Sequence, residues 1–266
     1  MELNLDKAFD FAVALMREAG ELLRGYWRRG VVAEYKGEID LVTEADRASE
    51  RLILDRIRAA YPDHAILSEE SGAITRGANS QPSRYQWIVD PLDGTTNFAH
   101  GYPIFSVTIA LLVNEITELG VTYDPLRDEL FTAKRGQGAR LNDRMIHVSE
   151  TPLLDQSLLA TGFPYDRRTN SDNNVRQHNM LLMKSHGVIR AGSAALDLAS
   201  VAGGRLDGYW EYRIKAWDSA AGILMVNEAG GCATNPAGDR LSGWASNVVA
   251  SNNLIQAEML AALQSA

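Results

Sequence analysis

The pattern of apolar and polar residues divides the chain into two halves. In the first half, about residues 1–150, apolar residues recur at helical spacing over residues 5–28 and 43–60. Strand-like runs follow at about residues 65–68, 85–90, 104–113, 117–123, 130–133 and 138–141. Turns separate the last four runs, so we expect them to form an antiparallel meander, which makes this half α+β.

The second half, about residues 151–266, alternates between the two kinds of element. Strands are expected at residues 157–161, 187–190, 208–212 and 247–251, and helices at residues 173–185, 193–203, 218–229 and 253–264. With 266 residues, 45% of them hydrophobic, the chain can bury a substantial core as one large domain or as two tightly joined halves. We expect a single domain over residues 1–266 with an α+β fold.

Composition narrows the range of functions. The net charge of −8 argues against general nucleic-acid binding, which needs an excess of lysine and arginine. The single cysteine, Cys232, permits no internal disulfide and fits a reducing cytoplasm. Charged residues interrupt the apolar spacing of residues 5–27, so this segment is an amphipathic helix and neither a signal peptide nor a membrane span.

The most informative segment for chemistry follows the strand at residues 85–90. It places two carboxylates, Asp90 and Asp93, three residues apart and directly before Gly94 and two threonines. Magnesium prefers hard oxygen ligands, usually one or two carboxylates together with water and substrate phosphate. A surface turn is the alternative, because Asp, Pro and Gly all favour turns.

Three further acidic elements stand at strand or helix ends. The run at residues 65–68 ends in Glu69 and Glu70, and Asp46 lies three residues after Thr43 at the start of the second helix. Asp218 precedes the apolar helix at residues 218–229. Taken alone, Asp46 and Asp218 are equally well explained as helix-capping residues that interact with the helix dipole.

Together these segments resemble the inositol monophosphatase family of magnesium-dependent, lithium-sensitive phosphatases. Two signatures carry the resemblance, Asp-Pro-Leu-Asp-Gly-Thr-Thr-Asn-Phe at residues 90–98 and Trp-Asp with a small-residue helix ending in Glu-Ala-Gly-Gly at residues 217–231. Matching segments at residues 40–46, 69–71 and 192–195 follow the family's order. The resemblance implies a layered α-β-α-β-α sandwich like that of inositol monophosphatase and fructose-1,6-bisphosphatase.

The resemblance also implies roles for individual residues. Glu70, Asp90 and the Leu92 carbonyl would hold one Mg²⁺, and Asp90, Asp93 and Asp218 would hold a second. A third, weaker ion near Glu70 would bring the number to two or three. Thr95 and Asp46 would orient and deprotonate the attacking water, and with Glu70 they form the expected catalytic set.

Substrate contacts are implied in the same way. Phosphate would bind the backbone N–H groups of Gly94 and Thr95, with Lys36 contributing from an earlier loop. The substrate's hydroxyl groups would meet Asp93, the backbone of Ala194, Glu211 and Asp218. Solvation is the alternative for Lys36, and an outward, solvated position on its strand is the alternative for Glu211.

The expected activity is hydrolysis of inositol 1- or 4-monophosphate by a cytoplasmic homodimer. Relatives within the same fold hydrolyse fructose 1,6-bisphosphate, 3′-phosphoadenosine 5′-phosphate or histidinol phosphate, but the sequence Thr95-Thr96-Asn97 resembles the inositol branch. A regulatory partner of nucleic-acid machinery is a second possibility, although the acidic balance argues against it as the sole role. A metal-binding protein without catalysis is a third, but such a protein would be expected to lose Thr95 or Asp46.

Overall fold

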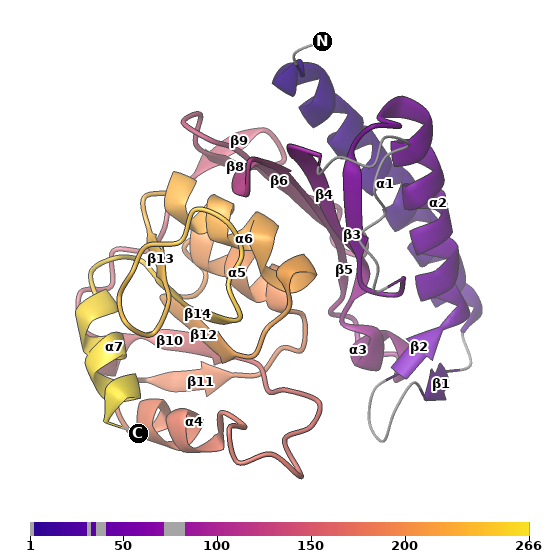
Figure 1. Ribbon diagram of the computed structural model, residues 1–266. Coiled ribbons are helices and arrows are strands. Elements are labelled where there is room, and N and C mark those ends of the chain that lie inside the picture. Colours follow the sequence, from indigo (N-terminus) through magenta and orange to yellow (C-terminus); the bar gives the residue numbers. More distant parts are fainter. Residues whose placement is uncertain (1–2, 31–32, 36–40, 72–82, 266) are drawn as a thin grey trace.

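The chain folds into five alternating layers of helices and sheets (Figure 1). The computed structural model describes residues 3–30, 33–35, 41–71 and 83–265. Helices α1 (Leu5–Arg29) and α2 (Glu44–Ala60) form the first layer, and a seven-stranded sheet forms the second. Helices α5 (Ala194–Ala202) and α6 (Ala216–Glu228) separate this sheet from a five-stranded one, which α4 (Val175–Leu182) and α7 (Gln256–Gln264) cover. The expected α+β layered sandwich is confirmed.

The seven-stranded sheet follows the chain in strict sequence order. Its strands are β3 (Ala65–Ser68), β4 (Tyr85–Asp93), β5 (Ser106–Val113), β6 (Ile116–Asp124), β7 (Glu129–Lys134), β8 (Ala139–Leu141) and β9 (Arg144–Ile146). Only the β3–β4 pair is parallel, and the other five pairs are antiparallel. The three pairs from β5 to β8 are the predicted meander, which β4 and the unpredicted strand β9 extend at its two ends. The short strands β1 (Ala33–Tyr35) and β2 (Leu41–Thr43) form a separate hairpin beside helix α3 (Thr95–Ala99).

The five-stranded sheet has crossovers, and its strands occur in the order β11-β10-β12-β14-β13. Strand β10 pairs in parallel with both β11 and β12, whereas β14 is antiparallel to β12 and β13. The strands are β10 (Leu158–Thr161), β11 (Gly187–Ile189), β12 (Gly208–Tyr212), β13 (Cys232–Thr234) and β14 (Asn247–Ser251), and a 3₁₀ turn covers Leu154–Gln156.

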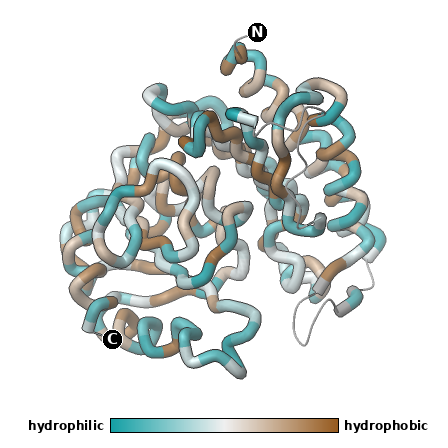
Figure 2. Tube along the Cα trace, viewed as in Figure 1, coloured by the Kyte–Doolittle hydropathy of each residue, from teal (hydrophilic) through white to brown (hydrophobic). Residues whose placement is uncertain are grey.

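Both faces of the seven-stranded sheet are buried, which explains its nearly continuous apolar strands. Along β4, Trp87 and Val89 pack with α1 and α2, whereas Ile88 faces α5 and α6. The hydropathy trace shows this apolar band between the two flanking layers (Figure 2). Packing on both faces fixes the register of β4 and therefore the position of its C-terminal end.

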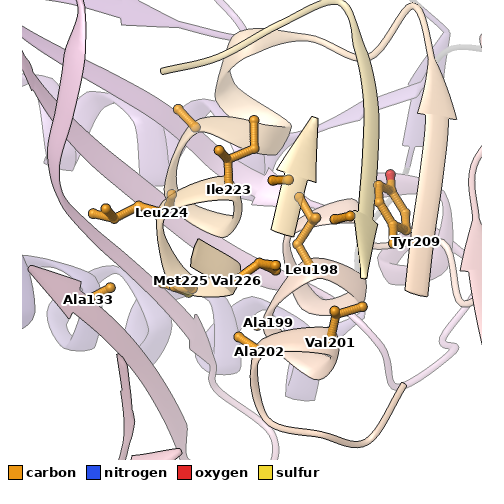
Figure 3. Packing of buried hydrophobic residues seen from close by; sticks show 14 of the residues in the cluster. Ala133, Leu198, Ala199, Val201, Ala202, Tyr209, Ile223, Leu224, Met225 and Val226 are labelled. Carbon is orange, nitrogen blue, oxygen red and sulfur yellow. The ribbon is translucent and has the colours of Figure 1, made fainter. Parts of the chain in front are cut away.

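Helices α5 and α6 form the centre of the molecule. Their side chains, including Leu198, Ile223 and Val226, interlock between the two sheets (Figure 3). Helix α6 is apolar on most of its surface because sheets lie on both sides of it. Small residues allow close contact: a Cβ on Gly120 of β6 would lie 2.8 Å from the Ala221 Cα of α6.

Several boundaries differ from the sequence prediction. Strand β4 continues to Asp93 rather than ending at residue 90, and α6 begins at Ala216, so Asp218 lies in its first turn rather than ahead of it. Helix α4 is shorter than expected at both ends, and α7 begins at Gln256 rather than at residue 253. Within the described part of the chain, no helix combines the length and the apolar character that crossing a bilayer requires.

Candidate functional site

A pocket of about 460 Å³ opens where the two halves of the chain meet. The first half contributes the end of β3, the end of β4 and the start of α3. The second half contributes the ends of β10 and β12 and the first turns of α5 and α6. The pocket lining includes these acidic side chains: Glu69, Glu70, Asp90, Asp93, Asp166, Asp197, Glu211 and Asp218.

An irregularity in β4 directs two of these carboxylates into the pocket. Asp90 is paired with Thr108 and Asp93 with Ser106, and the register shifts between them. Pro91 lies at the shift and has no N–H group with which to continue the ladder. The Leu92 N–H donates a hydrogen bond to Asp90 Oδ1 at 2.9 Å, which fixes the Asp90 side chain within the bulge.

Asp93 is held by the N-terminus of α5. Its carboxylate accepts hydrogen bonds from the hydroxyl of Ser193, the residue that caps this helix, and from the backbone N–H groups of Ala194 at 3.2 Å and Ala195 at 3.0 Å. The Ser106 hydroxyl donates a further bond at 3.1 Å. Residues from both halves of the chain therefore fix this side chain.

Asp218 completes a group of three carboxylates. It accepts a hydrogen bond from the Lys215 N–H at 3.0 Å, as a residue in the first turn of α6. One oxygen from each of Asp90, Asp93 and Asp218 lies within 4.8 Å of the other two. Opposite ligands of a Mg²⁺ ion are about 4.2 Å apart, since each Mg–O distance is about 2.1 Å, so the spacing suits a shared cation.

The electrostatics of this group also favour a cation. Burial raises the pKa of Asp90 and of Asp218 well above the ordinary value, and repulsion from neighbouring carboxylates raises both further. Burial raises the pKa of Asp93 as well, although the hydrogen bonds from Ser193 and Ala195 oppose this effect. A divalent cation would offset the repulsion, and three hard oxygen donors match the preference of magnesium.

Both glutamates at the end of β3 line the pocket, but they differ in their electrostatic neighbours. Glu69 is the largest charged contributor to the raised pKa of both Asp90 and Asp218. Glu70 instead contributes to the raised pKa of Arg47. The Glu69 N–H donates to the Val89 carbonyl at 3.3 Å, which holds its backbone beside β4. Glu69 is thus electrostatically coupled to Asp90 and Asp218.

The structure brings Thr95 and Asp46 together although they lie 49 residues apart. The Thr95 hydroxyl lies 2.9 Å from Asp46 Oδ1, and the Leu92 carbonyl is an alternative acceptor at 3.1 Å. Asp46 Oδ2 accepts bonds from the Thr43 N–H at 2.8 Å and the Thr43 hydroxyl at 2.5 Å, which is the predicted capping box of α2. Asp46 is therefore both a capping residue and the partner of Thr95.

Gly94 forms the turn between the acidic strand and α3. Its φ of 96° is in the left-handed region, and a Cβ there would lie 3.1 Å from the Ile104 carbonyl oxygen, so glycine is required on both grounds. Gly94 and Thr95 both line the pocket, as expected for phosphate binding. Lys36, the other expected phosphate contact, lies outside the described residues.

The expected contacts for the substrate's hydroxyl groups lie on the second half. The Ala194 N–H lines the pocket but donates to Asp93. Glu211 is partly buried and also lines the pocket, so it is not an outward, solvated strand residue. The Tyr209 hydroxyl donates to Glu211 Oε2, and burial raises the pKa of Glu211 to about 7.

Three residues of the site escaped the sequence analysis. Ser106 and Ser193 hold Asp93, and each is a small polar residue in an otherwise buried segment. Asp197 lines the pocket from α5 and is only 4% exposed. In the sequence, Asp197 is a lone carboxylate in the apolar run Ala-Ala-Leu-Asp-Leu-Ala. This pattern does not by itself indicate where the side chain points.

Comparisons with known proteins agree along the whole chain. An inositol-1-monophosphatase from Synechocystis sp. is 46% identical over 261 residues, which are 98% of this chain and 90% of that protein. The Nus factor SuhB of Escherichia coli is 43% identical, covering 95% of this chain and 94% of its own length. The structure of an inositol monophosphatase from Anabaena (Nostoc) sp. superposes with a TM-score of 0.87 at 44% identity, covering 99% of this chain and 97% of that one.

The family model of the inositol monophosphatases matches residues 4–266, which include every element of the pocket. Members of this family generally use Mg²⁺, in agreement with the carboxylate group and its electrostatics. The chain therefore belongs to the inositol monophosphatase family.

Proposed function

We propose that this protein hydrolyses inositol 1- or 4-monophosphate to inositol and phosphate with bound Mg²⁺. The observation that carries this proposal is the Thr95–Asp46 hydrogen bond beside the Asp90, Asp93 and Asp218 carboxylates. A site that only bound metal would need the carboxylates but not an oriented hydroxyl and its acceptor. Their combination supports hydrolysis rather than metal storage.

The residues that would hold the ions come from β4, its bulge and α6. Asp90, Asp93, Asp218 and the Leu92 carbonyl supply oxygens, and we place Glu69 in the position that the sequence resemblance gives to Glu70. Two or three ions are proposed. When bound, they would neutralise charge on the phosphoryl oxygens and make the attacking water more acidic.

Thr95 and Asp46 would position that water. A hydroxyl has one proton, and Thr95 can donate it to Asp46 Oδ1 at 2.9 Å. Its oxygen then has lone pairs to accept a hydrogen bond from water in the pocket. The Thr43 bonds to Asp46 Oδ2 hold the carboxylate still, so the water would be oriented before reaction.

The phosphate and the ring would be bound by different residues of the pocket. Gly94 and Thr95 line it from the first half of the chain, and their N–H groups would bind phosphate, together with Lys36. Glu211, Asp218 and the backbone at Ala194 would face the hydroxyl groups of the ring, beside Asp93. Carboxylates are hydrogen-bond acceptors, which suits a substrate with many hydroxyl donors.

A phosphate-release assay would test the proposal. Purified protein is given inositol 1-phosphate, fructose 1,6-bisphosphate, 3′-phosphoadenosine 5′-phosphate and histidinol phosphate, with Mg²⁺ and then with added Li⁺. We expect the highest kcat/KM for inositol 1-phosphate, inhibition by lithium, and a homodimer by light scattering. A clear preference for another substrate would replace the inositol assignment, and no release from any of them would contradict phosphatase activity.

A second role rests on the names of the relatives. Several proteins with 42–46% identity are called Nus factor SuhB. We propose a regulatory association with nucleic-acid machinery as an additional function, and the net charge of −8 favours a protein partner over direct nucleic-acid binding. Co-purification from the native host, followed by repetition with Asp93→Asn protein, would show whether such an association occurs and whether it needs the phosphatase site.

A further inference from the structure

A buried carboxyl group outside the proposed metal ligands lines the same pocket. Asp197 lies in α5, four residues after Ser193 and three after Ala194, so it shares the helix face that carries the pocket residues. Its exposed fraction is 4%. Asp197 is not one of the three carboxylates whose oxygens lie close enough to share a cation, Asp90, Asp93 and Asp218.

The Asp197 carboxylate is without a hydrogen-bond or ion-pair partner in the described part of the chain. Among residues 3–30, 33–35, 41–71 and 83–265, none donates a hydrogen bond to it or forms an ion pair with it. In the same set, the side-chain polar atom that is fully enclosed without a partner is Thr117 Oγ1. The Asp197 oxygens are therefore not sealed within protein but open to the pocket. Buried polar groups normally have partners, so a partner from outside the chain is expected.

The neighbours of Asp197 indicate the chemistry of that partner. Burial raises the pKa of Asp197 well above its usual range, repulsion from Asp93 and Glu211 raises it further, and the positive charge of Arg190 opposes this effect. Arg190 also lies near Glu211 and lines the pocket, so its positive charge reduces the attraction of this wall for a cationic ligand. Asp197 and Glu211 are hydrogen-bond acceptors beside the positive charge of Arg190. This arrangement suits neutral hydrogen-bond donors, and hydroxyl groups are such donors.

We propose that Asp197 is a specificity-determining residue that accepts a hydrogen bond from a ring hydroxyl, next to the hydroxyl bound by Glu211. The inference rests on the proposed function, because it adds a contact to a phosphorylated polyol in the same pocket. Adjacent hydroxyls would be recognised as a pair, and simple phosphate esters without hydroxyls would gain nothing from Asp197. Asp197 would then add to the polyol selectivity that Glu211 and Asp218 provide.

Steady-state kinetics with matched substrates would test this role. Myo-inositol 1-phosphate carries ring hydroxyls, and cyclohexyl phosphate has the same ring without them. We compare wild-type protein, Asp197→Leu, Asp197→Asn and the control Asp10→Asn, which removes one charge from an exposed position on α1. Each is assayed with Mg²⁺, and its melting temperature is measured without substrate.

We expect Asp197→Leu to lower kcat/KM for inositol 1-phosphate about ten-fold, mainly through KM, because the hydrogen bond from a ring hydroxyl is lost. Turnover of cyclohexyl phosphate should change less than about two-fold, since it makes no such bond. The kcat/KM of Asp197→Asn for inositol 1-phosphate should lie between the values of wild type and Asp197→Leu, because the amide oxygen still accepts a hydrogen bond. The melting temperature of Asp197→Leu should equal or exceed that of wild type, since an unpartnered buried carboxyl destabilises the fold.

Two results would overturn the role of Asp197 while leaving phosphatase activity established: an equal loss for both substrates, or no loss for inositol 1-phosphate. A lower melting temperature with unchanged substrate selectivity would indicate a structural role instead. If Asp197→Leu does not fold, the test uses Asp197→Asn instead. The ratio of its kcat/KM values for inositol 1-phosphate and cyclohexyl phosphate, compared with that of wild type, then decides whether Asp197 contributes to selectivity. If wild-type protein releases phosphate from neither substrate, the proposed function and the role of Asp197 both fail.

Discussion

At the scale of single residues, Thr95 and Asp46 do the most to separate hydrolysis from metal binding. Both side chains are almost fully buried, and neither is among the three clustered carboxylates. Asp46 is fixed by Thr43, so the hydroxyl of Thr95 has a defined direction. The same carboxylate caps α2, which explains why the sequence supports both a structural and a catalytic reading of Asp46.

Replacement of Thr95 tests its hydroxyl directly. Thr95→Ala should lower kcat by about 10²–10⁴-fold, the usual contribution of a positioned proton acceptor. Thr95→Ser keeps the hydroxyl and should retain activity within about ten-fold. Steady-state assays on inositol 1-phosphate at saturating Mg²⁺ give both values. If the alanine variant were as active as the serine variant, Thr95 would have no part in the reaction.

Glu211 should make stability depend on pH. Its pKa is about 7 in the folded protein, against an ordinary value of 4.5, and burial is the main cause. Because the folded pKa is the higher one, the stabilising contribution is complete below about pH 4.5 and is lost as the pH rises to about 7. Glu211→Gln should therefore melt at nearly the same temperature as wild type at pH 4.5 and at a higher temperature than wild type at pH 8.

Calorimetric melts of both proteins between pH 4.5 and pH 8 would measure this difference. Asp10→Asn, on the exposed surface of α1, is the control for a change of net charge. A melting-temperature difference between Glu211→Gln and wild type that stayed constant across the range would show that Glu211 has an ordinary pKa.

At the scale of elements, α6 positions the site through its contact with the seven-stranded sheet. Asp218 is in its first turn, and the helix lies directly on β6, where Gly120 approaches Ala221. A side chain at Gly120 would meet backbone atoms, which cannot rotate away as a flexible side chain could. The distance between α6 and β4, and hence between Asp218 and Asp90, depends on this contact.

Two glycine substitutions should have opposite effects. Gly120→Ala should destabilise the fold by roughly 1–3 kcal/mol through overpacking and should weaken Mg²⁺ binding by displacing α6. Gly25→Ala, in α1 with no neighbouring atom within 4 Å of its Cβ position, should stabilise the fold by roughly 0.5–1 kcal/mol. Urea unfolding and Mg²⁺ titration of both variants test this pair. A Gly120→Ala protein with the same free energy of unfolding as Gly25→Ala would refute the close contact between Gly120 and Ala221.

Much of the element order could be predicted because hydrophobic periodicity is a local property. The meander from β5 to β8 follows sequence order, so turns alone predict its pairing, whereas the short strand β9 has no such signal. The order of the five-stranded sheet depends on crossovers that pack helices between layers, and no local pattern determines it. Adjacent residues raise the same difficulty at the site: Glu69 and Glu70 are equivalent in the sequence pattern, and the electrostatic effect of Glu69 on Asp90 and Asp218 depends on the folded structure.

At the scale of the whole molecule, the site exists only when both halves are assembled. Asp90 and Asp93 belong to the first half and Asp218 to the second, and Ser193 of the second half holds Asp93. Asn97 further joins them by donating hydrogen bonds to the Ile104 and Ala191 carbonyls, both at 2.8 Å. The family signatures could predict Asp90, Asp93 and Asp218, which the structure brings together, whereas the serines that hold Asp93 arise from tertiary contacts.

Mg²⁺ should stabilise the assembled fold. At a concentration 100 times its dissociation constant, one ion adds about 2.7 kcal/mol, which corresponds to a rise in melting temperature of roughly 5–10 °C for a chain of this size. Asp218→Asn should lose this response yet melt no lower than wild type without metal, because one of three repelling carboxylates is gone. Differential scanning calorimetry with and without Mg²⁺ would show an unchanged response if Asp218 were not a ligand.

The most direct measurement of the central claim is anomalous diffraction from crystals of the protein grown with Mn²⁺ in place of Mg²⁺. The account predicts an anomalous peak within coordination distance of Asp90, Asp93 and Asp218, which is absent in crystals of Asp93→Asn. A crystal grown at saturating Mn²⁺ that shows no anomalous peak among these three carboxylates, or shows manganese bound only elsewhere, would contradict the metal site and the phosphatase mechanism built on it.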